Sequence, residues 1–148
     1  EAMELTEREQ FFIEHHPMLV QLQQEYTAFQ RKLTSQLTQL QQQMDDGIKH
    51  LTQLDKRWIY ASNCLVHDFV LTGHKIAFDL YIKPDGWTLQ LFGRNQTSQQ
   101  FLGNLIAQRL QTPIVDNNRF VIGTWPLQTP LDPIRDTLSE WMNWLDAQ

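Results

Sequence analysis

The sequence predicts an α+β fold, in which a long N-terminal amphipathic helix precedes a small antiparallel sheet flanked by two shorter helices. Three observations support this prediction. Apolar residues recur at steps of three and four between residues 19 and 51, which places them on one stripe of a helix. Strand-like segments separated by turn residues follow between residues 65 and 92. Two further helical patterns occupy residues 97–111 and the segment after residue 132. We expect a three-stranded meander plus one or two strands.

Composition describes a folded protein. The chain has 148 residues, of which 41% are hydrophobic and 11% aromatic, enough for one domain and an extension. A net charge of −5 makes a nucleic-acid partner unfavourable, because such binding needs basic surface. The single cysteine, Cys64, excludes an internal disulfide and fits a reducing compartment. No run of about 18 apolar residues predicts a membrane span, so a cytoplasmic location is expected.

The long helix is expected to begin at Pro17 and to end near Leu54. Pro17 suits a first helical turn, where its missing N–H costs nothing. Gly47 marks a weak point, at a cost of about 1 kcal/mol relative to alanine. We expect the helix to continue past it, because the stripe does. The stripe consists of Leu19, Leu22, Tyr26, Phe29, Leu33, Leu37, Leu40, Met44, Ile48 and Leu51.

The spacing of the stripe indicates how the helix is used. It is heptad-like from Leu19 to Leu33, as in a coiled-coil seam, and changes to an eleven-residue rhythm further on, which predicts a nearly straight helix. At about 1.5 Å per residue the helix exceeds the diameter, about 30 Å, of the remaining domain. We therefore expect a second copy of the chain to cover the stripe in a homodimer. The alternative is that the segment before Pro17 folds back on the helix as a hairpin and covers the stripe. The expected interface residues on the helix are Leu22, Tyr26, Phe29, Leu33, Leu37, Leu40 and Met44.

The domain organisation follows from this interpretation. Residues 1–56 are expected to form a helical oligomerisation segment, and residues 57–148 an α+β domain. Before the long helix, Thr6 and Glu9 have the spacing of a capping box, which predicts a short preceding helix. The first residues lack the basic-then-apolar pattern of a signal peptide. The start at Glu1 leaves open that the chain is part of a longer one.

The meander is expected to consist of strands at 65–71, 75–82 and 87–92. The turn 83–86 combines proline and glycine at favourable positions. If Lys83 pairs with Trp87, one hairpin face carries Ile76, Phe78 and Leu80 and forms the core. The other face then carries Tyr81 and Trp87. We expect a helix of the same chain to cover that face. The alternative is that the face is a docking surface.

The second half of the chain contains two further cap-like sequences. Thr97 and Ser98 resemble a cap for the helix over residues 97–111. Residues 114–115 and 119–123 are expected to form a short hairpin, or a loop and one strand. Asp132 is expected to be the N-cap of the last helix, with Pro133 in its first turn.

Motifs that carry chemistry are absent from the sequence. Five histidines and one cysteine do not form a zinc-finger spacing, and there is no H-E-x-x-H motif. The sequence contains neither a phosphate-binding glycine loop nor a G-x-S-x-G motif. Cys64 is expected to be buried and inert. No cofactor or metal is therefore expected, and no catalytic residue is assigned.

The order of helix, three strands, helix and strand resembles the restriction-endonuclease-like core. The resemblance implies an acidic residue on the second strand, then an acidic residue or glutamine and a lysine two positions later on the third. Asp79 matches the first position. The third strand offers Gln90, with Phe92 where lysine is expected. Asp68, Asp79 and Lys83 are the weak candidates for a relocated catalytic cluster, and ordinary surface charges explain them equally well.

Two functions are therefore expected from different classes. The favoured one is non-enzymatic protein–protein interaction, as an adaptor, assembly or regulatory protein that forms homodimers through the long helix and holds a protein partner. The alternative is a divergent metal-dependent nuclease, or an inactive relative of that fold that binds nucleic acid. Neither involves a membrane.

Overall fold

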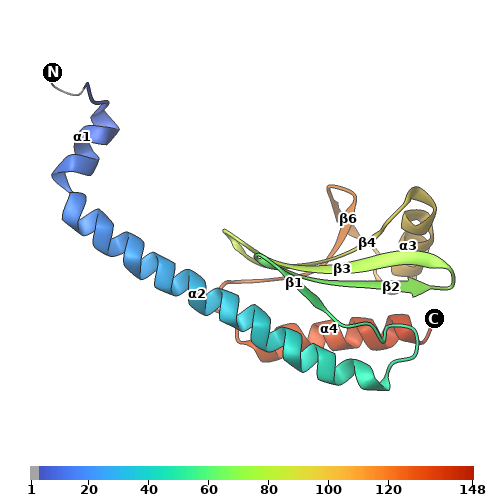
Figure 1. The fold of residues 1–148 in the computed structure, drawn as a ribbon. Coiled ribbons are helices and arrows are strands. Elements are labelled where there is room, and N and C mark those ends of the chain that lie inside the picture. The colour runs from blue at the N-terminus through green and yellow to red at the C-terminus, as the bar shows by residue number, and fades with distance from the viewer. Residues whose placement is uncertain (1–3) are drawn as a thin grey trace. The chain divides into compact units, whose positions relative to one another are not determined.

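The computed structural model describes residues 4–148 and confirms the α+β class. The chain divides into two compact units, Glu1–Ser35 and Gln36–Gln148. The expected boundary lay at residue 56, whereas the observed one lies inside the long helix, because the later turns of that helix belong to the core of the second unit. Figure 1 shows the elements along the chain.

The first unit begins with α1 (Glu7–Glu14), and its predicted capping box is confirmed. The Thr6 hydroxyl accepts a hydrogen bond from the Glu9 N–H at 3.1 Å, and the Glu9 carboxylate accepts one from the Thr6 N–H at 3.3 Å. His15 ends α1, and α2 (His16–Gly47) starts at the next residue. Pro17 therefore lies in the first turn of α2, as expected.

The end of α2 differs from the prediction. The α-helix stops at Gly47 and is followed by one 3₁₀ turn, η1 (Ile48–His50), instead of continuing to Leu54. Ile48 and Leu54 are still buried, but Ile48 reaches the core from the 3₁₀ turn and Leu54 from a bend after it. Glycine has low helix propensity, and the backbone beyond it finds other hydrogen-bond partners, so the apolar spacing alone did not keep it helical.

The second unit is built on a six-stranded sheet in the order β1-β2-β3-β4-β6-β5, in which every neighbouring pair is antiparallel. The predicted meander is confirmed, but the sheet is larger than the expected meander plus one or two strands, because one strand extends it at one edge and two strands extend it at the other. The strands are β1 (Ile59–Ala61), β2 (Cys64–Leu71), β3 (His74–Lys83), β4 (Gly86–Gly93), β5 (Ile114–Asp116) and β6 (Arg119–Trp125).

The core of this unit lies between the sheet and its helices. The final turns of α2 contribute three buried side chains, and α4 (Leu131–Asp146) lies on the same side of the sheet (Figure 1). The third helix, α3 (Gln96–Arg109), adds Leu102 and Ile106 to the same core. Its last residue, Arg109, lies over the ring of Trp141 in α4, 4.4 Å from the centroid.

The register of the central hairpin corrects a prediction. Lys83 pairs with Gly86, not with Trp87, so Trp87 pairs with Ile82. A shift of one residue moves every side chain of a strand to the opposite face. Trp87 therefore lies on the core face, away from Tyr81. Gly86 closes the turn with a φ of +144° against the Trp125 carbonyl, where a side chain would clash.

Two predicted helix caps lie at different residues. Asn95, not Thr97, caps α3, and its side chain accepts a hydrogen bond from the Ser98 N–H at 2.8 Å. The N-cap of α4 is Pro130, so Asp132 lies inside the first turn. An acidic residue there still interacts favourably with the helix dipole.

Candidate functional site

The first unit exposes an apolar surface on α2, the N-terminal stripe, which consists of Leu22, Tyr26, Phe29 and Leu33. Leu22 is 50% exposed, Tyr26 60% and Phe29 43%. Leu33 is half-buried. Every residue from Val20 to Lys32 is exposed, so the stripe has no cover from its own unit.

An uncovered stripe of this size is energetically unfavourable. Helices in proteins are stabilised mainly by packing of their apolar face, and a helical segment without such packing is marginal in water. Fully burying one large apolar side chain contributes about 1.5–3 kcal/mol. Monomeric proteins rarely expose contiguous apolar surface unless it is an interaction site. The stripe is therefore the strongest candidate for a functional surface in the first unit.

Three of the predicted helix interface residues do not belong to this surface. Leu37 and Leu40 are 0% exposed and Met44 is 3% exposed, all within the core of the second unit. The same periodicity thus serves two purposes along one helix. The structure places these three residues inside the chain's own core, which corrects their assignment to a seam between helices.

The other predicted interface residues, Tyr81 and Trp87, do not form a shared docking face. Trp87 is 1% exposed, and its indole N–H donates to the Leu127 carbonyl at 3.3 Å. Tyr81 lies on the other face of the sheet, where it pairs with Cys64 of the neighbouring strand β2.

Burial raises the pKa of the Cys64 thiol to about 11, with a contribution from the Asp79 carboxylate. The expectation that Cys64 is buried is confirmed, and its thiolate is disfavoured.

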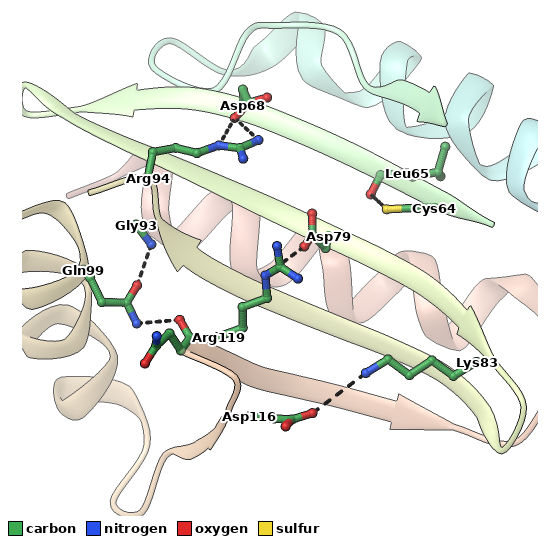
Figure 2. A network of polar contacts seen from close by, with 11 residues as sticks. Cys64, Leu65, Asp68, Asp79, Lys83, Gly93, Arg94, Gln99, Asp116 and Arg119 are labelled. Atoms are coloured by element: carbon green, nitrogen blue, oxygen red, sulfur yellow. Dashed lines mark hydrogen bonds and ion pairs between the residues drawn. The ribbon is translucent and has the colours of Figure 1, made fainter. Parts of the chain in front are cut away.

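The same sheet face carries the sheet charge cluster, which consists of three acid–base pairs (Figure 2). Asp68 of β2 pairs with Arg94 after β4 at 2.8 Å. Asp79 of β3 pairs with Arg119 of β6 at 3.4 Å. At the end of β3, the Lys83 amine lies 3.9 Å from a carboxylate oxygen of Asp116 in β5. Each pair joins residues that come from different strands or from their ends, so the three pairs link the strands across the sheet.

Asp79 is the most unusual member of this cluster. It is 2% exposed, and burial raises its pKa, while Arg119 and Arg94 act in the opposite direction. Its Oδ2 atom faces Arg119 without forming a well-directed hydrogen bond. Both guanidinium groups also lie over the ring of Phe92, at 4.9 Å for Arg94 and 4.4 Å for Arg119. The Phe92 ring thus contacts both cations.

This geometry bears on the predicted catalytic candidates. Asp68 and Asp79 do share a sheet face on neighbouring strands. Each is engaged by its own arginine, and Lys83 interacts with Asp116 instead of with either of them. Within residues 4–148, no three or more His, Cys, Asp or Glu side chains are grouped to hold a metal ion. The cluster is balanced in charge and has the features of a structural network.

Sequence reasoning did not find Arg119 or Asp116 as partners in the cluster. The pairing of β6 with β4 brings them there across the whole of α3, and no local pattern in the sequence encodes that pairing. It also missed Gln99, whose side-chain carbonyl accepts from the Gly93 N–H at 2.7 Å while its amide donates to the Asn118 carbonyl at 2.9 Å. Gln99 thus links α3 to β4 and to the β5–β6 turn.

Comparison of the chain with protein-family models, curated proteins and solved structures finds no match. Among the described residues, no helix combines the length and the apolar character needed to cross a bilayer. The assignment of a function therefore depends on the surfaces of the molecule itself.

Proposed function

We propose that this protein acts through protein–protein interaction, as an adaptor, assembly or regulatory protein that pairs with a second copy of itself through the N-terminal stripe. One observation carries the proposal: Leu22, Tyr26 and Phe29 form an exposed apolar row on a helix that has no cover within its own unit. The second unit, residues 36–148, then presents its surface to a protein partner.

The pattern of the stripe favours a helix as the occupant. Leu19, Leu22, Tyr26, Phe29 and Leu33 follow steps of three and four, which is the spacing of knobs in a two-helix seam. Glutamines flank the row on one side, and one acidic and one basic residue flank it on the other, so the two flanks carry no net charge that would repel another copy. A second identical helix offers the same row in return, which is how symmetric dimers are built.

The sheet charge cluster gives less support to the nuclease alternative. A metal-dependent nuclease needs carboxylates that are free to bind a cation. Here Arg94 holds Asp68 and Arg119 faces Asp79. No observation on the described residues favours nuclease chemistry over a structural role for these pairs.

The experiment is light scattering on a sizing column at several concentrations. The wild-type chain has a mass of 17.5 kDa per copy, and light scattering is expected to give a molar mass of twice that value. The double variant Phe29→Glu/Leu33→Glu is expected to be monomeric, because it places charge in the seam. Its matched control is Gln24→Glu/Ala28→Glu, which adds the same i,i+4 pair of glutamates outside the stripe and should remain dimeric. A monomeric wild type, or a dimeric Phe29→Glu/Leu33→Glu variant, would refute the proposal.

A further inference from the structure

The charged residues beside the N-terminal stripe carry information about how two copies pair. Glu25 directly precedes Tyr26, and Lys32 directly precedes Leu33, so both lie on the same flank of the stripe. The other flank carries Gln23 and Gln30, which follow Leu22 and Phe29. In heptad terms, Glu25 and Lys32 occupy g positions and the two glutamines occupy e positions. One flank is therefore charged with both signs, and the other is neutral.

The charged flank is available for contacts with another chain. Glu25 and Lys32 are both exposed, and neither forms an ion pair within the part of the chain that the structure describes. Glu25 accepts one long hydrogen bond, 3.4 Å, from the side-chain amide of Gln21 one turn earlier. A contact of that length on an exposed helix surface is weak and easily exchanged.

Two orientations of a paired helix place these charges differently. In a parallel pair, each g position faces an e position of the other helix. Glu25 would then face the partner's Gln30, and Lys32 would face the position of the partner's Leu37, which is 0% exposed in the core of its own chain. In an antiparallel pair, the two-fold axis runs across the helices, so each flank faces the same flank of the other copy. Glu25 would then face the partner's Lys32.

We propose that the second copy packs against the N-terminal stripe in the antiparallel orientation, centred between Tyr26 and Phe29. This inference rests on the proposed function and specifies its partner and geometry. Tyr26 then packs on the partner's Phe29, and Leu22 packs on the partner's Leu33. Glu25 pairs with the partner's Lys32, and symmetry repeats the pair at the other end.

The proposed alignment is consistent at every layer. Each aromatic side chain of the stripe meets an aromatic side chain, and each leucine meets a leucine. The reason is that the stripe has the order leucine, aromatic, aromatic, leucine, which is the same in both directions along the helix. On the neutral flank, Gln23 faces the partner's Gln30, and two amides can hydrogen-bond to each other. Interhelical charges at these positions set partner choice and orientation in coiled coils.

Charge reversal tests the orientation. The single variants Glu25→Lys and Lys32→Glu each place like charges opposite one another in the antiparallel dimer, twice by symmetry. Each is expected to raise the dimer dissociation constant about tenfold at low salt. The double variant Glu25→Lys/Lys32→Glu restores opposite charges and is expected to recover wild-type affinity. Arg31→Glu, which reverses a charge on the outer surface of the helix, is the matched control and should leave the dissociation constant unchanged.

A mixing experiment separates the two orientations directly. When the Glu25→Lys and Lys32→Glu variants are combined, the antiparallel model expects a heterodimer in preference to either homodimer, because only the mixed pair has opposite charges facing. A differently tagged copy of each variant and native mass spectrometry measure the proportions. A wild-type dimer whose affinity is unaffected by either single reversal, with statistical mixing, would overturn the antiparallel proposal and leave the proposed function standing. A monomeric wild type would overturn both.

Discussion

His67 illustrates at the scale of a single residue how the core sets protonation. It is 0% exposed, with the ring of Trp58 5.0 Å away and that of Phe69 5.5 Å away, centroid to centroid. Its Nε2 lies 2.6 Å from the Lys56 carbonyl, which only accepts, so Nε2 carries the proton. The Nδ1 atom has no hydrogen-bond partner among the described residues. A neutral imidazole fits this site, and a charged one does not.

This environment predicts that stability falls in mild acid. Burial lowers the pKa of His67, and it outweighs the opposing effects of the Lys56 hydrogen bond and of nearby carboxylates. Below about pH 6.5 the unfolded chain therefore takes up a proton that the folded chain resists, so the free energy of unfolding decreases as the pH falls. Urea unfolding between pH 8 and pH 5 measures the effect.

A variant at the same position provides the control for this prediction. His67→Phe keeps an aromatic ring among Trp58, Phe69 and Phe78 but cannot be protonated. Its unfolding free energy should depend less on pH than that of the wild type over the same range. Equal slopes for the two proteins would show that His67 is not the group responsible.

At the scale of elements, one carboxylate joins the end of α4 to the segment after α2. Asp146 accepts hydrogen bonds from the backbone N–H groups of Thr52 at 3.1 Å, Gln53 at 2.6 Å and Leu54 at 3.1 Å. Partial burial raises the pKa of Asp146, but these donors outweigh it, and the pKa lies below its usual value. The contact explains where the backbone donors go once the α-helix has ended at Gly47.

Asp146→Asn is expected to lower the free energy of unfolding by about 1–3 kcal/mol, because an amide oxygen is a weaker acceptor and its NH₂ group faces further donors. Chemical denaturation measures the change. Asp136→Asn, on the exposed side of the same helix, is the matched control and should change stability by less than about 0.5 kcal/mol. The Asp146 contribution should also be lost in the wild type as pH falls below about 4, where the carboxylate becomes protonated. Equal effects of the two variants would contradict the anchoring role.

At the scale of the whole molecule, the two units differ in kind. Every hydrophobic residue of the described chain that is fully buried lies in the second unit, starting at Leu37. The first unit holds the exposed stripe and α1, whose Phe11 and Phe12 are 47% and 46% exposed. We therefore expect the second unit to fold without the first.

Deletion of residues 1–35 is expected to leave a protein that folds cooperatively and is monomeric. The deletion removes the stripe and leaves the core residues in place, so the sheet and its helices should survive while self-association is lost. Circular dichroism with thermal unfolding tests the first part, and light scattering tests the second. A truncated chain that is unfolded, or that remains dimeric, would contradict the division of roles between the two units.

Local patterns in the sequence account for much of what the structure contains. The capping box at Thr6, the strands of the meander and the approximate extents of α3 and α4 all depend on residues close together in the chain. Proline, glycine and alternating apolar residues act on neighbouring backbone, so they are readable without tertiary context. The length of the long helix, which exceeds the diameter of the remaining domain, also predicted that part of it would lack cover.

Properties that depend on pairing between segments far apart in the sequence could not be predicted in the same way. The one-residue register of the central hairpin decided that Trp87 belongs to the core and Tyr81 to the other face. The pairing of β6 with β4 brought Arg119 to Asp79 and Asp116 to Lys83.

The sequence by itself determined that a continuous apolar stripe runs along a long helix, because helical periodicity is a local property. Only the tertiary structure decided how that stripe is divided. Leu37, Leu40 and Met44 are buried in the core of the second unit, while Leu22, Tyr26 and Phe29 are exposed in the first. The physical reason is that periodicity specifies which side of a helix is apolar, whereas the element that covers it is fixed by contacts between residues far apart in the sequence.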